Sequence, residues 1–246
     1  MKNALLHEGH RERLKGRFLS EGLESFETHN ILELLLFYSI PRKDTNEIAH
    51  ELLDRFGSLA GVFDASFDEL ITVDGVKENT ATFLKLIPQV AKKYMLSEHN
   101  DQELFDTADK IGRFFRDLYI GETKEVVYAL FLNNRYEKLG VKKIFTGSVN
   151  SSHISTRSIV DEVVRLDASM VVLAHNHPNG RITPSSEDID TTNTLLSTLR
   201  TLDICLLEHF LIANNEYVPI MFYTSSTNIL QDQQEFLRKN TNPNFL

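Results

Sequence analysis

The sequence predicts an α+β fold, in which an all-helical N-terminal domain precedes a mixed α/β domain. Short runs with helical spacing fill the first hundred residues, and a polar stretch at residues 97–103 follows them. Beyond this stretch, runs of β-branched and aromatic residues alternate with helical segments, which indicates a sheet packed against helices. We therefore expect a helical domain at residues 1–99 and a mixed α/β domain at residues 100–246.

Composition excludes several classes of protein. The 246 residues are 41% hydrophobic and 25% charged, an ordinary globular balance. The net charge of −9 opposes general binding to nucleic acid. No apolar run approaches the roughly 20 residues of a membrane helix, and the N-terminus lacks the apolar core of a signal peptide. One cysteine cannot form an intramolecular disulfide or a cysteine-rich zinc site. We expect a soluble, cytoplasmic protein that does not contact a membrane.

Capping residues predict where the N-terminal helices begin and end. Asn30 can cap a helix that must stop before Pro41, because the residue that precedes a proline is pushed out of helical geometry. Asp44 or Thr45 can cap the next helix, and Gly57 suits the position just after its end.

The elements of the second domain follow from its apolar runs and turn signals. The run Glu125–Leu132 predicts a buried strand, and pairs of asparagines at residues 133–134 and 214–215 indicate hairpin turns. The remaining expected elements are strands at 138–149, 169–174, 204–213 and 217–221, and helices at 108–119, 157–166 and 185–202.

The richest chemistry follows the strand expected at residues 169–174. His175 and His177 are two residues apart, so their imidazoles project to the same side of the chain. Ser185 comes after Pro184 and opens a helix, with Asp188 one turn further on. Two histidine nitrogens and one carboxylate, with a fourth position left to water, is the arrangement of a catalytic zinc site. We therefore expect His175, His177 and Asp188 to bind Zn²⁺.

Helix capping alone explains part of this pattern. Ser185 and Asp188 also fit a capping box, in which a serine begins the helix and an acid three residues later bonds back to it. Capping does not explain the two histidines, and both interpretations can hold together.

Other His-x-His sites lack residues that they require. A metallo-β-lactamase-type site needs an acid and a histidine where Asn179 and Gly180 stand. An amidohydrolase barrel needs about 250 residues, far more than follow His175. The chain has no His-Glu-x-x-His helix, and one cysteine is too few for a zinc deaminase.

The spacing His-x-His-x7-Ser-x2-Asp resembles the JAMM motif of the JAB/MPN metalloproteases. In that family a glutamate on an earlier strand completes the site. Glu125 stands at the matching position, with Glu122 as the alternative. The resemblance implies a zinc-dependent hydrolase in which Glu125 is the general base and Ser185 stabilises the oxyanion.

A more specific resemblance extends over nearly the whole chain. His-Asn-His-Pro-Asn-Gly at residues 175–180 and Pro-Ser-Ser-Glu-Asp at 184–188 are similar to the signature of the bacterial RadC family. The chain has Asn179 where that family usually has serine, and Ser-Thr-Arg at residues 155–157 where it often has His-Pro-Arg. The resemblance implies a JAB/MPN domain with a cytidine-deaminase-like fold.

The N-terminal domain carries a second resemblance. Residues 70–81 look like a helix-hairpin-helix, whose turn amides can hold a DNA phosphate. Lys77 replaces the second glycine of that motif, and Asp74 and Glu78 add negative charge beside it.

Two functions follow from these resemblances. The first is a zinc-dependent peptidase or isopeptidase acting on a peptide or amide substrate that the sequence does not identify. The alternative is a DNA repair or recombination accessory protein that binds DNA through the N-terminal domain. The oligomeric state is open.

Overall fold

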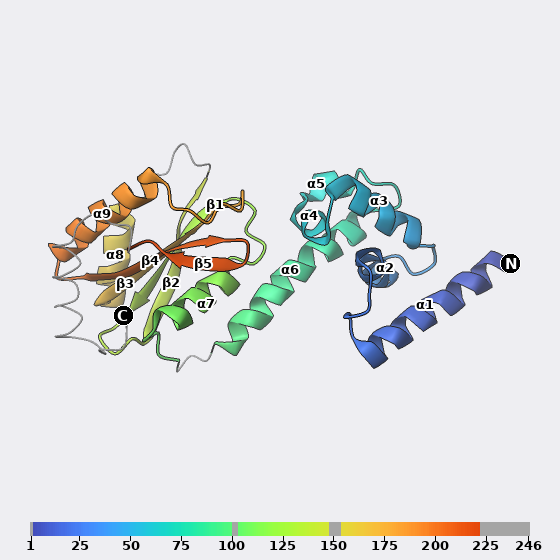
Figure 1. Ribbon diagram of the computed structural model, residues 1–246, viewed down its shortest axis with the longest axis horizontal. Helices are drawn as coiled ribbons and strands as arrows, with labels where there is room; N and C mark the ends of the chain where they lie inside the picture. Colours follow the sequence, from blue (N-terminus) through green and yellow to red (C-terminus); the bar gives the residue numbers. More distant parts are fainter. Residues whose placement is uncertain (1, 100–102, 148–153, 222–246) are drawn as a thin grey trace. The chain divides into compact units, whose positions relative to one another are not determined.

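The computed structural model describes residues 2–99, 103–147 and 154–221, with only the backbone described for residues 2–8. The chain divides into two compact units, Met1–Ala91 and Lys92–Leu246 (Figure 1). This confirms an α+β fold, helical first and mixed afterwards. Helix α6 (Glu78–Glu98) crosses the division and includes the first residues of the expected polar linker. The domain boundary after residue 99 therefore stays a prediction.

The N-terminal unit is built from helices around a main apolar core, and a smaller buried cluster holds Leu14, Leu34 and Phe37. Leu32, Leu36, Leu52, Leu70 and Leu84 are among its fully buried side chains. Besides the first part of α6, its helices are α1 (Lys2–Glu21), α2 (Thr28–Ser39), α3 (Asn46–Phe56), α4 (Leu59–Asp64) and α5 (Phe67–Leu70).

The structure tests the predicted helix ends. Thr45 occupies the N-cap position of α3, but its side chain makes no capping hydrogen bond, and Asp44 Oδ1 accepts from the Asn46 amide at 3.0 Å. Gly57 follows the helix in the left-handed conformation, where glycine avoids the strain of a Cβ atom. The prediction for Asn30 is wrong, because α2 already begins at Thr28 after Glu27.

The residues that resemble a helix-hairpin-helix form the end of α5, a connecting turn and the start of α6. Gly75 has a positive φ of 81°, and Asp74 Oδ1 accepts a hydrogen bond from its amide at 3.0 Å. One turn amide is thus bound within the hairpin. A contact with DNA at this turn stays a prediction.

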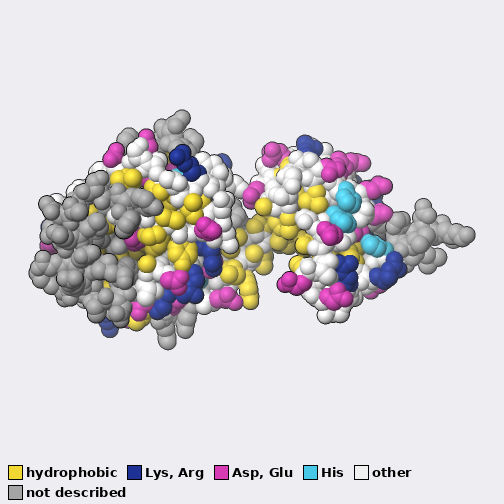
Figure 2. Space-filling view, in the orientation of Figure 1, with side chains coloured by type: hydrophobic (Ala, Val, Ile, Leu, Met, Phe, Trp, Pro, Cys, Tyr) yellow, Lys and Arg dark blue, Asp and Glu magenta, His cyan; other side chains and the backbone are white. Residues whose placement is uncertain are grey.

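Helix α6 changes character along its length. Its first turns bury Thr80, Ala81 and Leu84, whereas Leu86, Val90 and Tyr94 are each more than half exposed. Figure 2 shows hydrophobic side chains at the surface along this helix.

The second unit centres on a mixed sheet of the strands β1 (Glu125–Leu132), β2 (Lys138–Gly147), β3 (Met170–Asn176), β4 (Cys205–Ala213) and β5 (Glu216–Pro219). In the described residues their order is β2-β1-β3-β4-β5. Only β3 and β4 pair in parallel; the other neighbours are antiparallel. The strands form where the apolar runs predict them, although residues 148 and 149 of the second expected strand lie outside the described residues.

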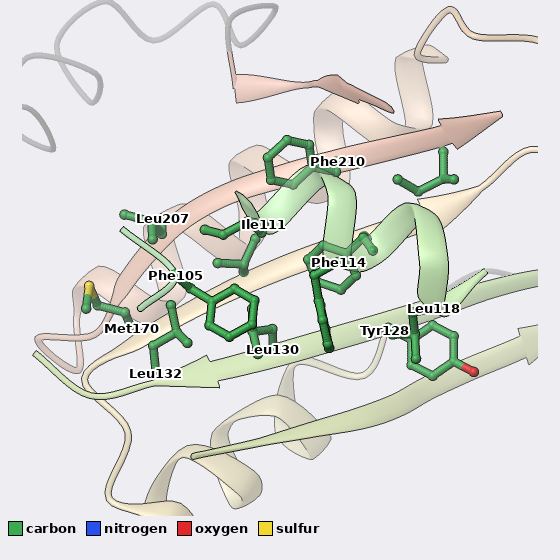
Figure 3. Packing of buried hydrophobic residues seen from close by; sticks show 14 of the residues in the cluster. Phe105, Ile111, Phe114, Leu118, Tyr128, Leu130, Leu132, Met170, Leu207 and Phe210 are labelled. Atoms are coloured by element: carbon green, nitrogen blue, oxygen red, sulfur yellow. The ribbon is translucent and has the colours of Figure 1, made fainter. Parts of the chain in front are cut away.

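Helices cover both faces of the sheet. On one face α7 (Ala108–Leu118) packs Ile111, Phe114 and Phe115 against β1, β3 and β4 (Figure 3). On the other face α8 (Thr156–Leu166) and α9 (Ser186–Arg200) cover a second cluster that includes Leu173 and Leu195.

Strand alternation decides which polar side chains meet α9. Because successive side chains of a strand point to opposite faces, the face that carries Leu173 also receives His175. Val127 of β1 and Leu211 of β4 both pair with His175, so their side chains lie on the same face as His175. Glu125 and His209 each lie two residues before these partners in their strands, so they are on this face as well. No helix in the described part of the chain is both long enough and apolar enough to cross a membrane.

Candidate metal centre

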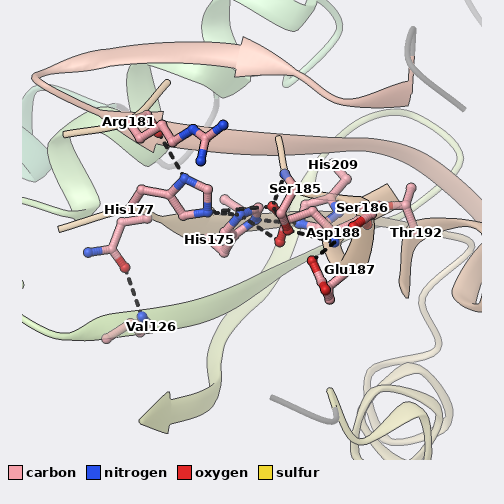
Figure 4. Close-up of polar contacts among 12 residues, drawn as sticks. Val126, His175, His177, Arg181, Ser185, Ser186, Glu187, Asp188, Thr192 and His209 are labelled. Atoms are coloured by element: carbon pink, nitrogen blue, oxygen red, sulfur yellow. Dashed lines mark hydrogen bonds and ion pairs between the residues drawn. The ribbon is translucent and has the colours of Figure 1, made fainter. Parts of the chain in front are cut away.

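The expected ligands meet where the end of β3 faces the beginning of α9 (Figure 4). His175 is the second-last residue of β3, where it pairs with Leu211 of β4, and it is buried. His177 follows directly after the strand. Asp188 is the third residue of α9. The strand end fixes the backbone at His175, and the capped helix start fixes it at Asp188. The His177 amide donates to the Ile212 carbonyl at 2.9 Å, which holds the third position.

One nitrogen or oxygen atom of each of these three residues lies within 4.8 Å of the others. The Nε2 atoms of His175 and His177 are 3.2 Å apart. Asp188 faces both rings, with Oδ1 at 3.1 Å from His175 Nε2 and Oδ2 at 3.5 Å from His177 Nε2. Three groups that offer lone pairs therefore converge on one point.

His177 is held in a defined orientation by the loop that follows it. Its Nδ1 donates to the carbonyl oxygen of Arg181 at 2.8 Å, so Nε2 of the neutral ring carries the lone pair. The hydrogen bond to Asp188 is the main reason that the pKa of His177 is raised above its ordinary value. A cation between these groups, either a proton or a metal ion, is thus favoured.

Ser185 orients Asp188 through the predicted capping box. Its hydroxyl donates to Asp188 Oδ2 at 2.7 Å and accepts from the Asp188 amide at 3.1 Å. The Ser185 amide also donates to Oδ2 at 2.7 Å. Burial raises the pKa of Asp188, but the two imidazole rings of His175 and His177 beside it outweigh burial and hold this pKa well below its usual range. Asp188 is therefore a carboxylate across the ordinary pH range.

Glu125 lies at the first position of β1 and reaches the same place. A cavity of about 20 Å³ is lined by Glu125, His175, Asp188 and His209, among others, which is room for one water molecule. Glu125 Oε2 is buried without a hydrogen-bond partner among the described residues. Burial raises the pKa of this carboxyl, while the nearby His175 opposes the rise. An orphaned carboxylate oxygen beside a water-sized cavity needs a proton donor there.

The alternative acid is bound elsewhere. Glu122 accepts hydrogen bonds from the Tyr128 hydroxyl at 2.7 Å and from Lys92 and Lys143 at 3.0 and 3.1 Å. Burial opposes these contacts, yet together they lower the pKa of Glu122. The structure thus places Glu125, and not Glu122, beside His175.

Asn176 joins the two strands that carry these groups. Its Oδ1 accepts from the Val126 amide at 2.8 Å, and its Nδ2 donates to the Lys124 carbonyl at 3.0 Å. The backbone pairing of β1 with β3 ends at Val127 and His175. The Asn176 side chain therefore continues the ladder and fixes the backbone on both sides of Glu125.

Two buried polar residues of the centre were missed by sequence reasoning. His209 Nε2 lies 2.9 Å from His175 Nδ1, and Thr192 Oγ1 lies 2.7 Å from His209 Nδ1. Burial, followed by the proximity of His175, lowers the pKa of His209 well below its ordinary value, so this ring is neutral. The available signal was the polar pair at residues 208–209 within an otherwise apolar strand.

The donor set fits a zinc ion. Imidazole nitrogen and carboxylate oxygen are ordinary zinc ligands, and three protein ligands with a further open position are typical of catalytic zinc. The cavity beside the three groups leaves space for a ligand at the open position. The unpartnered oxygen of Glu125 is a proton acceptor next to that space.

Comparisons with known proteins agree with this architecture. Residues 105–222 match the family described as a RadC-like JAB domain. A UPF0758 protein of Fusobacterium nucleatum subsp. nucleatum is 38% identical over 222 residues, which cover 87% of this chain and 96% of the relative. With that identity over nearly the full length of both proteins, the chain belongs to the RadC (UPF0758) family and carries a RadC-like JAB domain.

Proposed function

We propose that this protein is a zinc-dependent hydrolase of peptide or isopeptide bonds. The observation that carries the proposal is the placement of Glu125 Oε2, buried and without a partner among the described residues, beside the convergent His175, His177 and Asp188. A capped helix with two satisfied histidines would not need an unpartnered carboxylate next to a water-sized cavity. The JAB-domain family of the chain is compatible with this chemistry.

His175, His177 and Asp188 would hold the metal through Nε2, Nε2 and a carboxylate oxygen. Zinc, when bound, supplies Lewis acidity that brings the pKa of a water molecule toward neutrality. Glu125 Oε2 accepts a proton from the attacking water molecule while the water oxygen adds to the substrate carbonyl carbon. The same carboxyl then delivers this proton to the amine that leaves when the carbon–nitrogen bond breaks. The raised pKa of Glu125 suits both transfers.

Ser185 would act on the substrate oxygen. In the structure its hydroxyl hydrogen points to Asp188, so a bond to the developing oxyanion requires a rotation of this hydroxyl. The Asp188 carboxylate keeps the bond from the Ser185 amide during that rotation. Ser185 can thereby orient the ligand and stabilise negative charge in turn.

Glu125→Gln tests the assignment, with Glu122→Gln as the matched control. Glutamine has the shape of glutamate but cannot take up the proton, so we expect the Glu125 variant to lose at least 100-fold in hydrolysis, on the order of a general base's contribution, while it keeps its zinc. The control should retain hydrolysis. The assay is cleavage of a quenched-fluorescence peptide library, together with metal analysis. Loss of zinc in Glu125→Gln, or equal activity in both variants, would contradict the role of Glu125.

DNA binding by the N-terminal unit is the competing function. The hairpin turn at Gly75 is present, but Asp74 binds its amide and places a carboxylate there. A titration of the full chain with duplex DNA at increasing salt separates the two functions, since phosphate contacts weaken steeply with salt.

A further inference from the structure

A chain of buried polar groups leads away from the candidate metal centre into the protein. His175, His209 and Thr192 are each no more than 2% exposed, and they come from β3, β4 and α9 (Figure 4). Polar groups at such positions cost free energy unless they are paired. These three residues pair with one another, and Thr192 bonds on to the backbone of Asp188.

The direction of each hydrogen bond in this chain follows from its far end. Thr192 Oγ1 lies 2.6 Å from the carbonyl oxygen of Asp188, which can only accept, so the single hydroxyl hydrogen of Thr192 is used there. Toward His209, Thr192 can therefore only accept, at 2.7 Å. His209 Nδ1 must carry the hydrogen of this bond.

The same reasoning assigns the direction of the hydrogen bond between His209 and His175. A neutral imidazole with hydrogen on Nδ1 has a lone pair on Nε2. A charged ring would need a carboxylate partner in this buried position, and the bonds found for His209 go to Thr192 and His175. At 2.9 Å, His209 Nε2 therefore accepts from His175 Nδ1. The neutral ring of His175 is therefore left with its lone pair on Nε2, the atom that faces His177 and Asp188.

We propose that His209 and Thr192 are positioning residues that hold His175 in the tautomer with a free Nε2 lone pair. Only the consequence for metal binding rests on the proposed function; the tautomer itself is a property of the metal-free protein. We call the hydrogen bonds from the Asp188 carbonyl through Thr192 and His209 to His175 the relay. Because the relay begins on the backbone of Asp188, it couples the orientation of His175 to the position of Asp188. His177 reaches the same tautomer through one bond to a backbone carbonyl.

The direct readout is the nitrogen NMR spectrum of the His175 ring in the metal-free full chain at pH 8. We expect Nδ1 to be protonated and Nε2 unprotonated in the wild type. In His209→Leu the acceptor is lost, so the His175 hydrogen should redistribute between the two nitrogens. His209→Gln can accept from His175 and donate to Thr192, so it should restore the wild-type pattern. A purely structural role for His209 would leave the tautomer unchanged in every variant that folds.

Zinc affinity gives the second readout, measured by competition with a chelating dye. Loss of a hydrogen-bond partner behind a ligating histidine typically weakens metal binding by 10–100-fold, and we expect a weakening in this range for His209→Leu. Thr192→Val should weaken zinc binding in the same direction, with Thr192→Ser as the rescue. Thr194→Val is the matched control, because Thr194 also donates to the carbonyl four residues earlier but is exposed on the same helix.

The outcomes separate the two proposals. A folded His209→Leu or Thr192→Val variant with the wild-type tautomer of His175 would overturn the relay. If His209→Leu does not fold, the comparison of Thr192→Val with Thr192→Ser still decides. A wild-type protein that shows the expected tautomer but takes up no zinc would support the relay and contradict the proposed function.

Discussion

Replacing Asn176 should loosen the strand end that carries Glu125. Asn176→Leu keeps most of the side-chain volume but removes the acceptor of the buried Val126 amide and the donor to the Lys124 carbonyl. Lys124 is exposed, so water can replace its partner, whereas Val126 is fully buried. The cost is therefore that of one unsatisfied buried amide, about 1–3 kcal/mol. For a chain of this size this corresponds to a fall in Tm of roughly 3–10 °C.

Amide hydrogen exchange is the assay that locates this effect. We expect the Val126 amide to exchange about tenfold faster or more in Asn176→Leu, since 1.4 kcal/mol of local stability corresponds to a factor of ten. Asn193→Leu is the control, because it makes the same exchange at a residue whose buried Oδ1 has no hydrogen-bond partner among the described residues. An unchanged Tm together with a protected Val126 amide in Asn176→Leu would refute the reasoning.

Two further predictions concern pH. Burial raises the pKa of Glu208 to about 7, although hydrogen bonds from the Met221 and His209 amides lower it. The folded state therefore binds this proton more tightly than the unfolded state does. The free energy of unfolding should fall by about 3 kcal/mol between about pH 4.5 and 7. Glu208→Gln keeps the acceptor for both amides and should flatten the pH dependence of urea unfolding, and an equal slope in both proteins would contradict the assignment. The raised pKa of His177 means that protons compete for its Nε2 already above pH 6.5. The decrease in Tm caused by adding chelator should therefore be small at pH 5 and become larger toward pH 8. A decrease in Tm that does not depend on pH would argue against His177 as a ligand.

Much of the fold could be predicted because the second domain is marked by strong local patterns. The run Glu125–Leu132 is apolar and β-branched throughout, and β1 has these bounds in the structure. The end of β3 was less predictable: the expected strand stops at residue 174, whereas pairing with β4 extends β3 through His175 and Asn176. A single segment does not reveal which strand will lie beside it.

The same limit applies to the centre itself. The spacing of His175, His177 and Asp188 lies within one segment and resembles a known motif, so the sequence could point to these residues. His209 and Thr192 are 34 and 17 positions away from their partners His175 and His209. The parallel pairing of β3 with β4 brings His209 to His175, and the packing of α9 on the sheet brings Thr192 to His209. Before these contacts are known, Thr192 is one of several polar residues at 190–194, and His209 is half of a polar pair in an apolar strand.

X-ray absorption at the zinc edge tests the central claim most directly. The account predicts one zinc ion per chain in the wild type, with nitrogen and oxygen ligands at about 2.0–2.2 Å, two imidazoles among them and no sulfur. It also predicts loss of this zinc in His177→Ala and its retention in His50→Ala, a histidine exposed on α3 in the N-terminal unit. A wild-type protein without zinc after incubation with the metal, or zinc that remains in His177→Ala with an unchanged ligand shell, would contradict the claim.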